Sequence, residues 1–216
     1  MHTSRISCRW WVAVIAALAL AALLQGCSAK RQPLPAEQRP ASRYDAKSKL
    51  VDGHDLDRFS DSQLRVWVAA RVNMPPEKAF RMMAVDLHLW FPGVKRFTWN
   101  HAHSQRPGEF GPGSVRTGVY KGDRMVEKVL LWYPPRYYVY RIDLDATEAF
   151  IPINGHLGIF TVEADGQGGS FITWRQYFHP SVPLTGSLVA WVMEGVAEEA
   201  FDNLTATFGG NRFEGP

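Results

Sequence analysis

Hydrophobic positions in the central part of the chain repeat every second residue. Between residues 64 and 72, Val66 and Val68 alternate with Trp67 and Arg71, which is the period of a half-buried strand. Six later segments also read as strands, separated by short connections, several of them rich in glycine or proline: residues 97–99, 114–121, 124–133, 136–144, 153–163 and 170–178. Short connections cannot serve as crossovers between parallel strands. The pattern therefore predicts an antiparallel meander.

Two segments have helical spacing instead. The first starts at Pro76, and its apolar residues are Ala79, Phe80, Met82, Met83 and Leu87. The second covers residues 184–208, and one broad face holds Val189, Met193, Val196, Ala197, Ala200, Phe201, Leu204 and Phe208. Leu188 and Trp191 lie off that face, so the start of this helix is apolar nearly all round. We expect that another element covers this end, or that it borders an opening.

The N-terminus has the construction of an export signal. Arg5 and Arg9 precede an uncharged apolar run over residues 10–24, which is too short for a comfortable transmembrane helix. The run ends in Leu24-Gln25-Gly26-Cys27, which resembles the bacterial lipobox. That resemblance implies that residues 1–26 are a lipoprotein signal peptide and that Cys27 is lipidated. The alternative is an ordinary signal peptide or anchor in which the cysteine has no role.

Residues 27–62 read as a lipidated cysteine followed by a flexible tether. The segment contains three prolines and many charged residues but no recurring apolar face, so burial cannot offset its ordering entropy. Its basic residues could touch anionic headgroups, although a solubilising spacer is the simpler interpretation. We expect the folded domain to cover residues 63–212.

Composition excludes several classes of function. Removal of residues 1–26 leaves 22 basic against 21 acidic side chains, a balance that does not suit nucleic-acid binding. The chain has two cysteines, Cys8 and Cys27, so the mature domain has no thiol for a disulfide, a redox pair or a nucleophile. Phosphate-binding loops, dinucleotide fingerprints and Gly-x-Ser-x-Gly elbows do not occur in the sequence.

The order of elements and several short motifs resemble the SRPBCC superfamily. The motifs are residues 73–77 (Asn-Met-Pro-Pro-Glu) with Ala79-Phe80, Trp90 through Pro92-Gly93-Val94, Val129 and Trp132 through Pro134-Pro135-Arg136 with Tyr140, and Gly169-Ser170, Ile172, Trp174 and Phe178-His179-Pro180. The resemblance is strongest to polyketide cyclase/dehydrase-like bacterial members. It implies an α+β helix-grip (Bet v 1-like, START-like) fold, in which a curved antiparallel sheet wraps around a long C-terminal helix. Such proteins bind hydrophobic molecules between sheet and helix, and only some catalyse reactions.

Small residues on the last helix indicate where a hydrophobic cavity would lie. Ala197 and Ala200 are on its inner stripe, where a tight core would place leucine, and a space lined by apolar groups can accept an apolar guest. With strand alternation, the expected ligand-binding residues are Met125, Val129, Leu131, Tyr138, Tyr140, Ile142, Ile172, Trp174, Met193, Ala197, Ala200 and Phe201. The alternative is that these side chains form a filled core.

Glu127 is the one candidate for catalysis. If it faces inward with Val129, burial would raise the pKa of its carboxyl group toward the range of a general acid. The competing interpretation is a structural ion pair with Arg116, Arg141 or Arg175. His101 and His103 have the spacing of two ligands on one strand face, but the sequence places no third ligand, so we predict neither a metal nor a cofactor.

The sequence therefore predicts a protein that binds or transports a hydrophobic small molecule or lipid. We expect it in the bacterial cell envelope, anchored through Cys27. Ser28 follows that cysteine, which favours the outer membrane with the domain facing the periplasm. A cyclase- or dehydratase-type enzyme and an interaction module with a filled core remain alternatives. A cavity with convergent polar groups would favour the enzyme, and a cavity without such groups would favour the carrier. The absence of a cavity would favour the interaction module.

Overall fold

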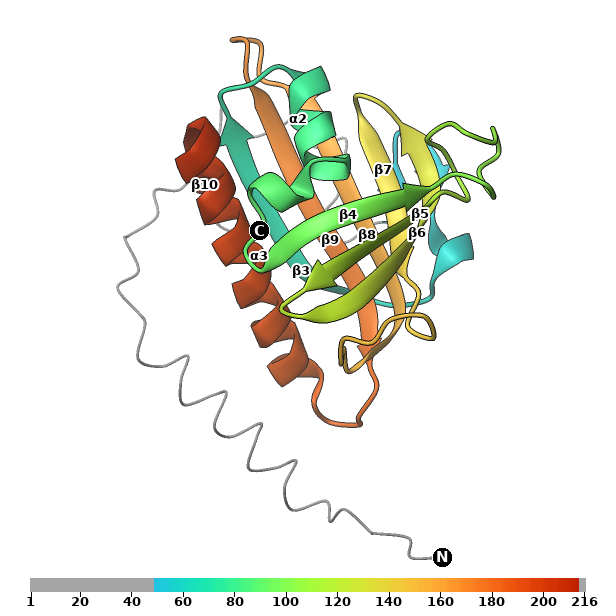
Figure 1. The fold of residues 1–216 in the computed structure, drawn as a ribbon. Coiled ribbons are helices and arrows are strands. Elements are labelled where there is room, and N and C mark those ends of the chain that lie inside the picture. Colours follow the sequence, from blue (N-terminus) through green and yellow to red (C-terminus); the bar gives the residue numbers. More distant parts are fainter. Residues whose placement is uncertain (1–48, 214–216) are drawn as a thin grey trace, which may run out of the picture. The chain divides into compact units, whose positions relative to one another are not determined.

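A strongly curved antiparallel sheet of eight strands is the frame of the protein (Figure 1). The computed structural model describes residues 49–213. The strands are β3 (Leu64–Val72), β4 (Val94–Asn100), β5 (Val115–Tyr120), β6 (Asp123–Tyr133), β7 (Tyr137–Ile142), β8 (Ile153–Ala164), β9 (Ser170–Pro180) and β10 (Gly210–Phe213). They lie in the order β10-β3-β9-β8-β7-β6-β5-β4, and every neighbouring pair is antiparallel. The predicted meander is confirmed, with strand ends within a few residues of those expected.

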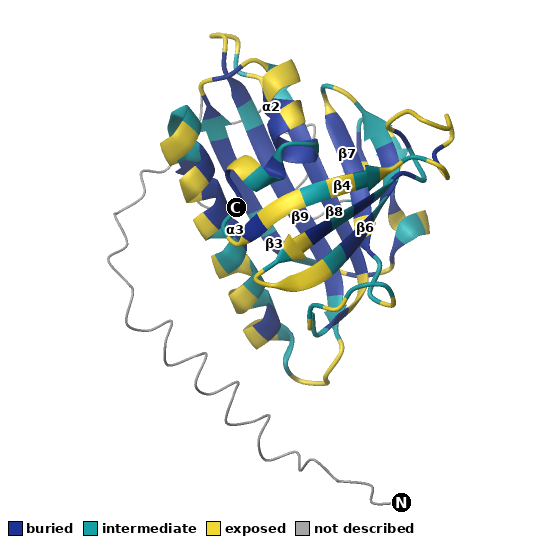
Figure 2. Cartoon of the chain, viewed as in Figure 1, coloured by how far each residue is buried: buried dark blue, intermediate teal, exposed yellow. Residues whose placement is uncertain are grey.

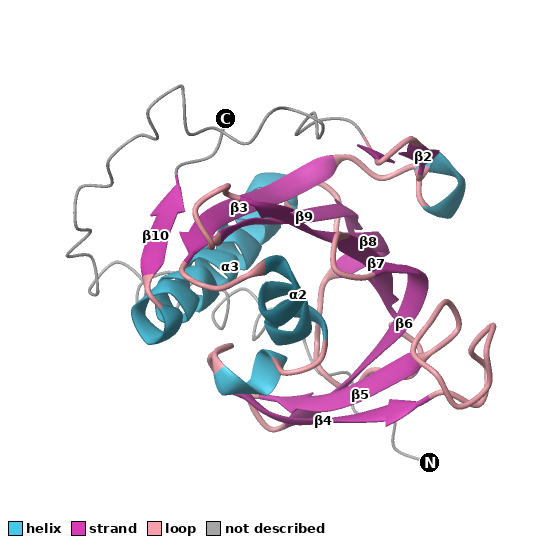
Figure 3. Cartoon of the chain, turned by 90° about the horizontal axis from the view of Figure 1, so that it is seen from above, coloured by secondary structure: helices cyan, strands magenta, loops and turns pink. Residues whose placement is uncertain are grey.

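Helical segments lie against the concave side of the sheet. Seen from above, the sheet bends around α2 (Pro76–Ala84) and the short 3-10 helix η3 (Leu87–Leu89), while α3 (Gly186–Phe208) runs beside β3 (Figure 3). Pro76 fits the first turn of α2 because its missing N–H would have no partner there. Within residues 49–213, no helix has both the length and the apolar character needed to cross a membrane. The α+β helix-grip prediction is confirmed.

The strand β10 was not predicted, and two glycines make it possible. Gly209 ends α3 with φ +76°, and at Gly210 a Cβ atom would lie 1.9 Å from the carbonyl oxygen of Arg71. Only glycine allows this approach of two backbones, because any side chain would collide with β3. Arg212 on β10 then bonds to Glu198 (2.7 Å) and Asp202 (2.6 Å), which holds α3 to the sheet edge.

The main hydrophobic core fills the space between the concave face and the helices. Buried residues line the inner side of the sheet and the sides of α2 and α3 that face it (Figure 2). Its members include Val68, Met83, Trp90, Tyr138, Phe160, Trp174, Phe178, Ala197, Phe201 and Leu204. This inner core is the region where the sequence places a ligand.

A second, outer core lies on the other face of the sheet and corrects the predicted tether. The segment before β3 forms β1 (Leu50–Val51), β2 (His54–Asp55) and the 3-10 helix η2 (Asp57–Phe59). Val51 and Leu56 are fully buried there against strand residues Leu131, Tyr137, Val139, Leu157, Ile159 and Tyr177. Two isolated apolar side chains suffice because the sheet supplies the rest of this core. The folded region therefore begins before residue 63. The expectations for residues 1–48, Cys27 included, lie outside the described residues.

Candidate functional site

The concave face carries a stack of aromatic rings that reaches from the sheet to α3. The ring centroids of Trp174 and Phe160 are 4.9 Å apart, and those of Phe160 and Tyr138 are 5.2 Å apart, in both cases nearly parallel. On the other side, Trp174 stacks on Phe201 of α3 at 6.3 Å. Strand alternation turns these residues inward together. They form an apolar, polarisable wall suited to a hydrophobic molecule.

A glycine in β8 shapes this wall. Gly158 pairs with Tyr140 of β7, and a Cβ atom at Gly158 would lie 2.3 Å from two atoms of the Tyr140 ring. The ring therefore lies across the backbone of β8, where any larger residue would displace it.

Most predicted ligand-binding residues gather in the inner core. Eight are buried there: Tyr138, Tyr140, Ile142, Ile172, Trp174, Ala197, Ala200 and Phe201. Met193 is half-buried at the edge of this core. The structure thus brings these nine residues together, and their role in binding stays a prediction.

Three predicted residues of β6 do not join that core. Between Val129 and Leu131 the pairing with β7 shifts by one residue, and Leu131 consequently lies in the outer core opposite Val139. Val129 is buried but belongs to neither core, and Met125 is only partly buried, opposite Gly118. The inward orientation expected for Leu131 was wrong because a one-residue shift reverses the face of every following side chain.

Glu127 forms a buried ion pair with Arg116, which the sequence raised as the structural alternative. The two side chains are 6% and 3% exposed, and Arg116 Nη2 lies 2.5 Å from Glu127 Oε2. Burial acts to lower the pKa of Arg116, but the Glu127 carboxylate together with Tyr138 and Tyr140 raises it by more, so the pKa lies above its usual value. The guanidinium also lies over the rings of Phe97, Trp99 and Tyr140. The Glu127 carboxylate is therefore engaged in an ion pair with Arg116.

The same part of the interior fastens the end of α2 to the sheet. Arg116 donates a hydrogen bond to the carbonyl oxygen of Ala84, and the hydroxyl of Tyr138 donates to that of Met83, both at 2.8 Å. Burial raises the pKa of Tyr138, which keeps this hydroxyl protonated. Because the last carbonyl groups of a helix have no partner within it, these bonds fix α2 above the aromatic wall.

His156 and Gln176 add polar groups to the concave face, and neither was among the site residues expected from the sequence. The backbone N–H of Ile142 donates to His156 Nδ1 (3.1 Å), so the neutral ring carries its proton on Nε2, 3.4 Å from Gln176 Oε1. Burial lowers the pKa of His156 to about 4. The ring is consequently neutral at pH 7, and its Nδ1 lone pair is already used, so it cannot act as a general base.

Tyr140 offers a hydroxyl group to a guest molecule. It accepts a hydrogen bond from Trp174 Nε1 (3.1 Å), and its own proton has no acceptor among residues 49–213. Burial raises the pKa of Tyr140 well above its usual value, so the group stays a neutral donor. A single donor in an apolar site suits an oxygen atom of an otherwise hydrophobic ligand.

The two histidines considered as metal ligands, His101 and His103, lie in different environments. His101 Nδ1 lies 2.9 Å from Ser114 Oγ, and its ring packs on Trp99 and Phe110. His103 lines a surface hollow. Across the described part of the chain, no group of three His, Cys, Asp or Glu side chains is placed to hold a metal ion.

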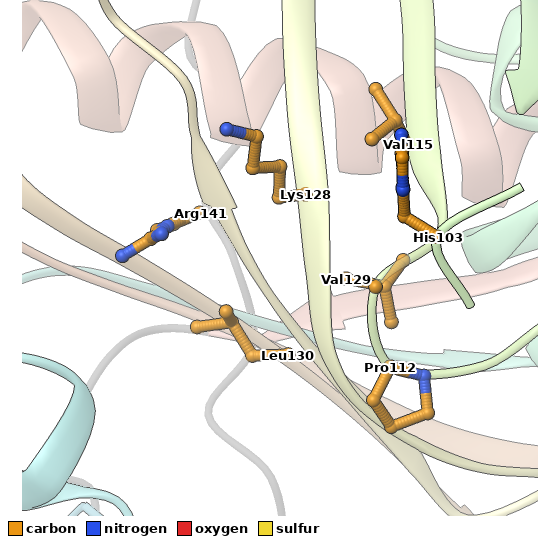
Figure 4. Close-up of a pocket in the computed structure, with 8 residues that line it drawn as sticks. His103, Pro112, Val115, Lys128, Val129, Leu130 and Arg141 are labelled. Atoms are coloured by element: carbon orange, nitrogen blue, oxygen red, sulfur yellow. The ribbon is translucent and has the colours of Figure 1, made fainter. Parts of the chain in front are cut away.

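Two surface hollows lie away from α3. One of about 420 Å³, on the outer side of β5–β7, is lined by His103, Pro112, Gly113, Val115, Lys128, Val129, Leu130 and Arg141 (Figure 4). Another of about 580 Å³ is lined by Lys49, Asp57, Asp61, Ser62, Gln63, Leu64 and Tyr177. Neither includes a residue of α3. In the first, Lys128 is bound to Asp143 at 2.6 Å, and this bond lowers the pKa of the Asp143 carboxyl group.

Solved structures of low sequence identity have the same fold. The protein XoxI from Bacillus cereus is 18% identical, with a TM-score of 0.53, over 66% of this chain and 94% of that chain. An uncharacterized protein from Bacillus thuringiensis is also 18% identical, with a TM-score of 0.53, over 66% of this chain and 97% of that chain. Among curated proteins, none matches this sequence.

A family model decides the classification. The model described as polyketide cyclase / dehydrase and lipid transport matches residues 63–209, which is more than half of the chain and covers β3 through α3. The resemblance to the SRPBCC superfamily is thereby confirmed. The chain belongs to the polyketide cyclase/dehydrase and lipid transport family.

Proposed function

We propose that this protein carries a hydrophobic small molecule or lipid, which it binds between the concave face of the sheet and α3. The description of its family includes lipid transport, and hydrophobic ligand binding is the activity that the family suggests. The aromatic wall supplies the apolar surface, and the Tyr140 hydroxyl supplies one oriented donor.

The loose packing of the first half of α3 carries the proposal. Between Gly186 and Val196 only Val189 is buried, whereas Ala197, Ala200, Phe201 and Leu204 are all buried in the second half. Ala190, Met193 and Val196 pack against the inner core only partly buried, so the first half has fewer buried contacts to lose than the second and can move away from the sheet at lower cost. A ligand could then pass between it and the sheet, with Met193 at the edge of the opening.

We further propose that the carrier is tethered to a membrane of the bacterial envelope. The apolar run over residues 10–24 and Cys27 supports an acyl anchor, and Ser28 supports an outer-membrane position facing the periplasm. Replacement of Cys27 by serine should abolish incorporation of an alkyne-labelled fatty acid in the bacterial host. Labelling that is unchanged in Cys27→Ser would contradict the anchor.

Two alternatives each have one supporting observation. The neutral Tyr140 hydroxyl in an apolar site would suit an enzyme of the cyclase or dehydratase type. The filling of the interior by aromatic side chains, with both hollows elsewhere, would suit an interaction module.

Native mass spectrometry of residues 28–216 tests the carrier directly. We expect a defined lipid or polyketide-like mass to co-purify from a bacterial host, or to be taken up from a lipid extract. Met193→Trp should reduce uptake by blocking the opening, whereas Thr207→Trp, on the exposed side of the same helix, should not. An apo mass without any uptake would contradict carriage and favour the module. Chemical conversion of the bound molecule would favour the enzyme.

A further inference from the structure

Large apolar side chains are exposed together where β9 connects to α3. Val182 and Leu184 are in the loop, and Leu188, Trp191 and Val192 follow in the first two turns of the helix. Leu184 is fully exposed, and each of the others exposes between 38% and 50% of its surface. We call these five residues the apolar tip. It occupies one end of the domain, at the lower end of α3 in Figure 1. Contiguous apolar surface of this kind marks an interaction site.

The apolar tip has no charged residue. Asp, Glu, Lys and Arg are absent from residues 180–193, while the following turns of α3 carry Glu194, Glu198, Glu199 and Asp202. A partner protein with charged complementary groups would find no ion-pair partner within this stretch. An uncharged stretch of large apolar side chains with a tryptophan, beside which the Arg65 guanidinium lies close to Gly186, suits the boundary between lipid headgroups and acyl chains.

The backbone of the loop holds the apolar tip outward. Ser181 N–H donates to the carbonyl oxygen of Pro152 (2.9 Å), and the Thr185 hydroxyl donates to that of Val182 (2.7 Å). Between these bonds, Leu184 adopts φ +68°, a left-handed conformation that is costly for leucine. The loop thus presents a bulky apolar side chain to solvent at a position where glycine would be more stable.

The rest of the chain indicates which partner covers this surface. Residues 28–48 separate Cys27 from the first described residue, and 21 residues can span at most about 75 Å. A domain anchored through Cys27 therefore stays within reach of the bilayer throughout. Each collision that orients the apolar tip toward the lipid can bury its five side chains.

We propose that the apolar tip inserts into the lipid bilayer that holds the anchor. This inference rests on the proposed membrane tether and adds the orientation of the domain. Val189, between Leu188 and Trp191, belongs to the inner core, and Met193, directly after Val192, borders it. Insertion therefore places the opening beside α3 at the membrane surface, where a lipid can pass between the bilayer and the interior without crossing water.

A site-specific fluorescent probe tests the insertion. Every described strand pair and both cores lie within residues 49–213, so residues 28–216 retain them all and also contain no cysteine. Leu184→Cys and Gln167→Cys can each carry a nitrobenzoxadiazole label, because Gln167 is exposed in the hairpin at the opposite end of β9. With vesicles of phosphatidylethanolamine and phosphatidylglycerol, the label at position 184 should brighten and be quenched by doxyl lipids. The label at position 167 should not respond.

Vesicle sedimentation of variants provides the second measurement. Leu184→Ser combined with Trp191→Ser should weaken partitioning by about tenfold or more, because both side chains lose apolar area. Leu89→Ser removes a side chain that is 55% exposed on η3 and should leave partitioning unchanged. Leu184→Gly should raise the midpoint of thermal unfolding, because glycine adopts the left-handed backbone conformation without strain. The same substitution should weaken partitioning of the protein into the vesicles. That opposite movement separates loss of docking from loss of folding.

Failure of the membrane-insertion proposal can be distinguished from failure of the acyl anchor and from failure of the carrier function. Equal responses of the labels at positions 184 and 167, or equal partitioning of all variants, would overturn the insertion. Elution of the protein as a dimer that the Leu184/Trp191 variant dissociates would assign the apolar tip to self-association instead. Vesicle binding by residues 28–216 does not require Cys27, so it can succeed where the acyl-labelling test fails. It also does not require a bound ligand.

Discussion

Replacement of Glu127 by glutamine tests the charge balance of the interior. The substitution preserves shape but removes the carboxylate that lies 2.5 Å from the guanidinium of Arg116. Arg116 then keeps its hydrogen bond to the Ala84 carbonyl oxygen but has no opposite charge beside it. A buried charge that loses its partner destabilises a protein by about 3–5 kcal/mol. Domains of this kind are stable by about 5–15 kcal/mol, so Glu127→Gln should remove a large part of the total.

Urea unfolding followed by tryptophan fluorescence measures this effect. With a denaturant dependence of about 2 kcal/mol per molar urea, the unfolding midpoint should fall by about 2 M. The double variant Arg116→Met with Glu127→Leu replaces both charges by apolar side chains of similar size. It should cost about 1–3 kcal/mol, less than Glu127→Gln, because no unpaired charge remains and the main loss is the hydrogen bond to the Ala84 carbonyl oxygen.

Two results would refute this reasoning. A loss below about 1 kcal/mol in Glu127→Gln would mean that the guanidinium is hydrated and that the pair is not closed to water. A double variant as unstable as the single one would mean that packing, rather than charge, controls this region. If Glu127 acted as a catalytic acid, Glu127→Gln would abolish turnover of a substrate and leave the urea midpoint almost unchanged.

Four further substitutions, one of them a control, probe the interior and the outer core. Burial lowers the pKa of His156 from 6.5 to about 4, so its contribution to stability is complete above pH 6.5 and is lost as the pH falls toward 4. Urea unfolding should show a loss of about 2 kcal/mol between pH 7 and pH 5, and His156→Gln should remove most of that difference. Gly158→Ala should lower the free energy of unfolding by about 2 kcal/mol or more, because the new methyl group displaces Tyr140. In its control, Gly195→Ala, no atom lies within 4 Å of the Cβ position, so thermal unfolding should show a gain in stability of up to about 1 kcal/mol. Leu56→Ala should cost about 2–5 kcal/mol in urea unfolding, and a cost below about 0.5 kcal/mol would show that residues 49–62 do not stabilise the domain.

The order and type of the elements could be read from the sequence because local patterns determine them. Alternation of apolar and polar residues indicated β3 and β5 to β9, and the glycine and proline turns separated them. Elements without such a pattern were missed. The strand β10 has four residues, and β1 and β2 have two each, which is too short for a period to be visible.

The candidate site was predictable in outline but not in its polar contacts. Alternation grouped Tyr138, Tyr140 and Trp174 on shared faces, the apolar weight of those faces placed them inward, and the structure buries all three in the inner core. The hydrogen bonds of His156 to Ile142 and Gln176 join three different strands. Such contacts depend on strand register, which turn lengths and irregular pairings set and which no local pattern records.

The sequence by itself determined the order of strands and helices and the apolar character of the start of α3, since periodicity and composition are properties of neighbouring residues. The helix-grip fold and the family followed from the resemblance of short motifs to the SRPBCC superfamily. Only the tertiary structure decided that Leu131 faces outward, that Glu127 meets Arg116, and that Val51 and Leu56 complete an outer core. Each of these facts joins residues that are distant in the chain or depends on a shift in strand pairing. Burial and charge compensation arise between such residues, so they exist only once the sheet has closed around its helices.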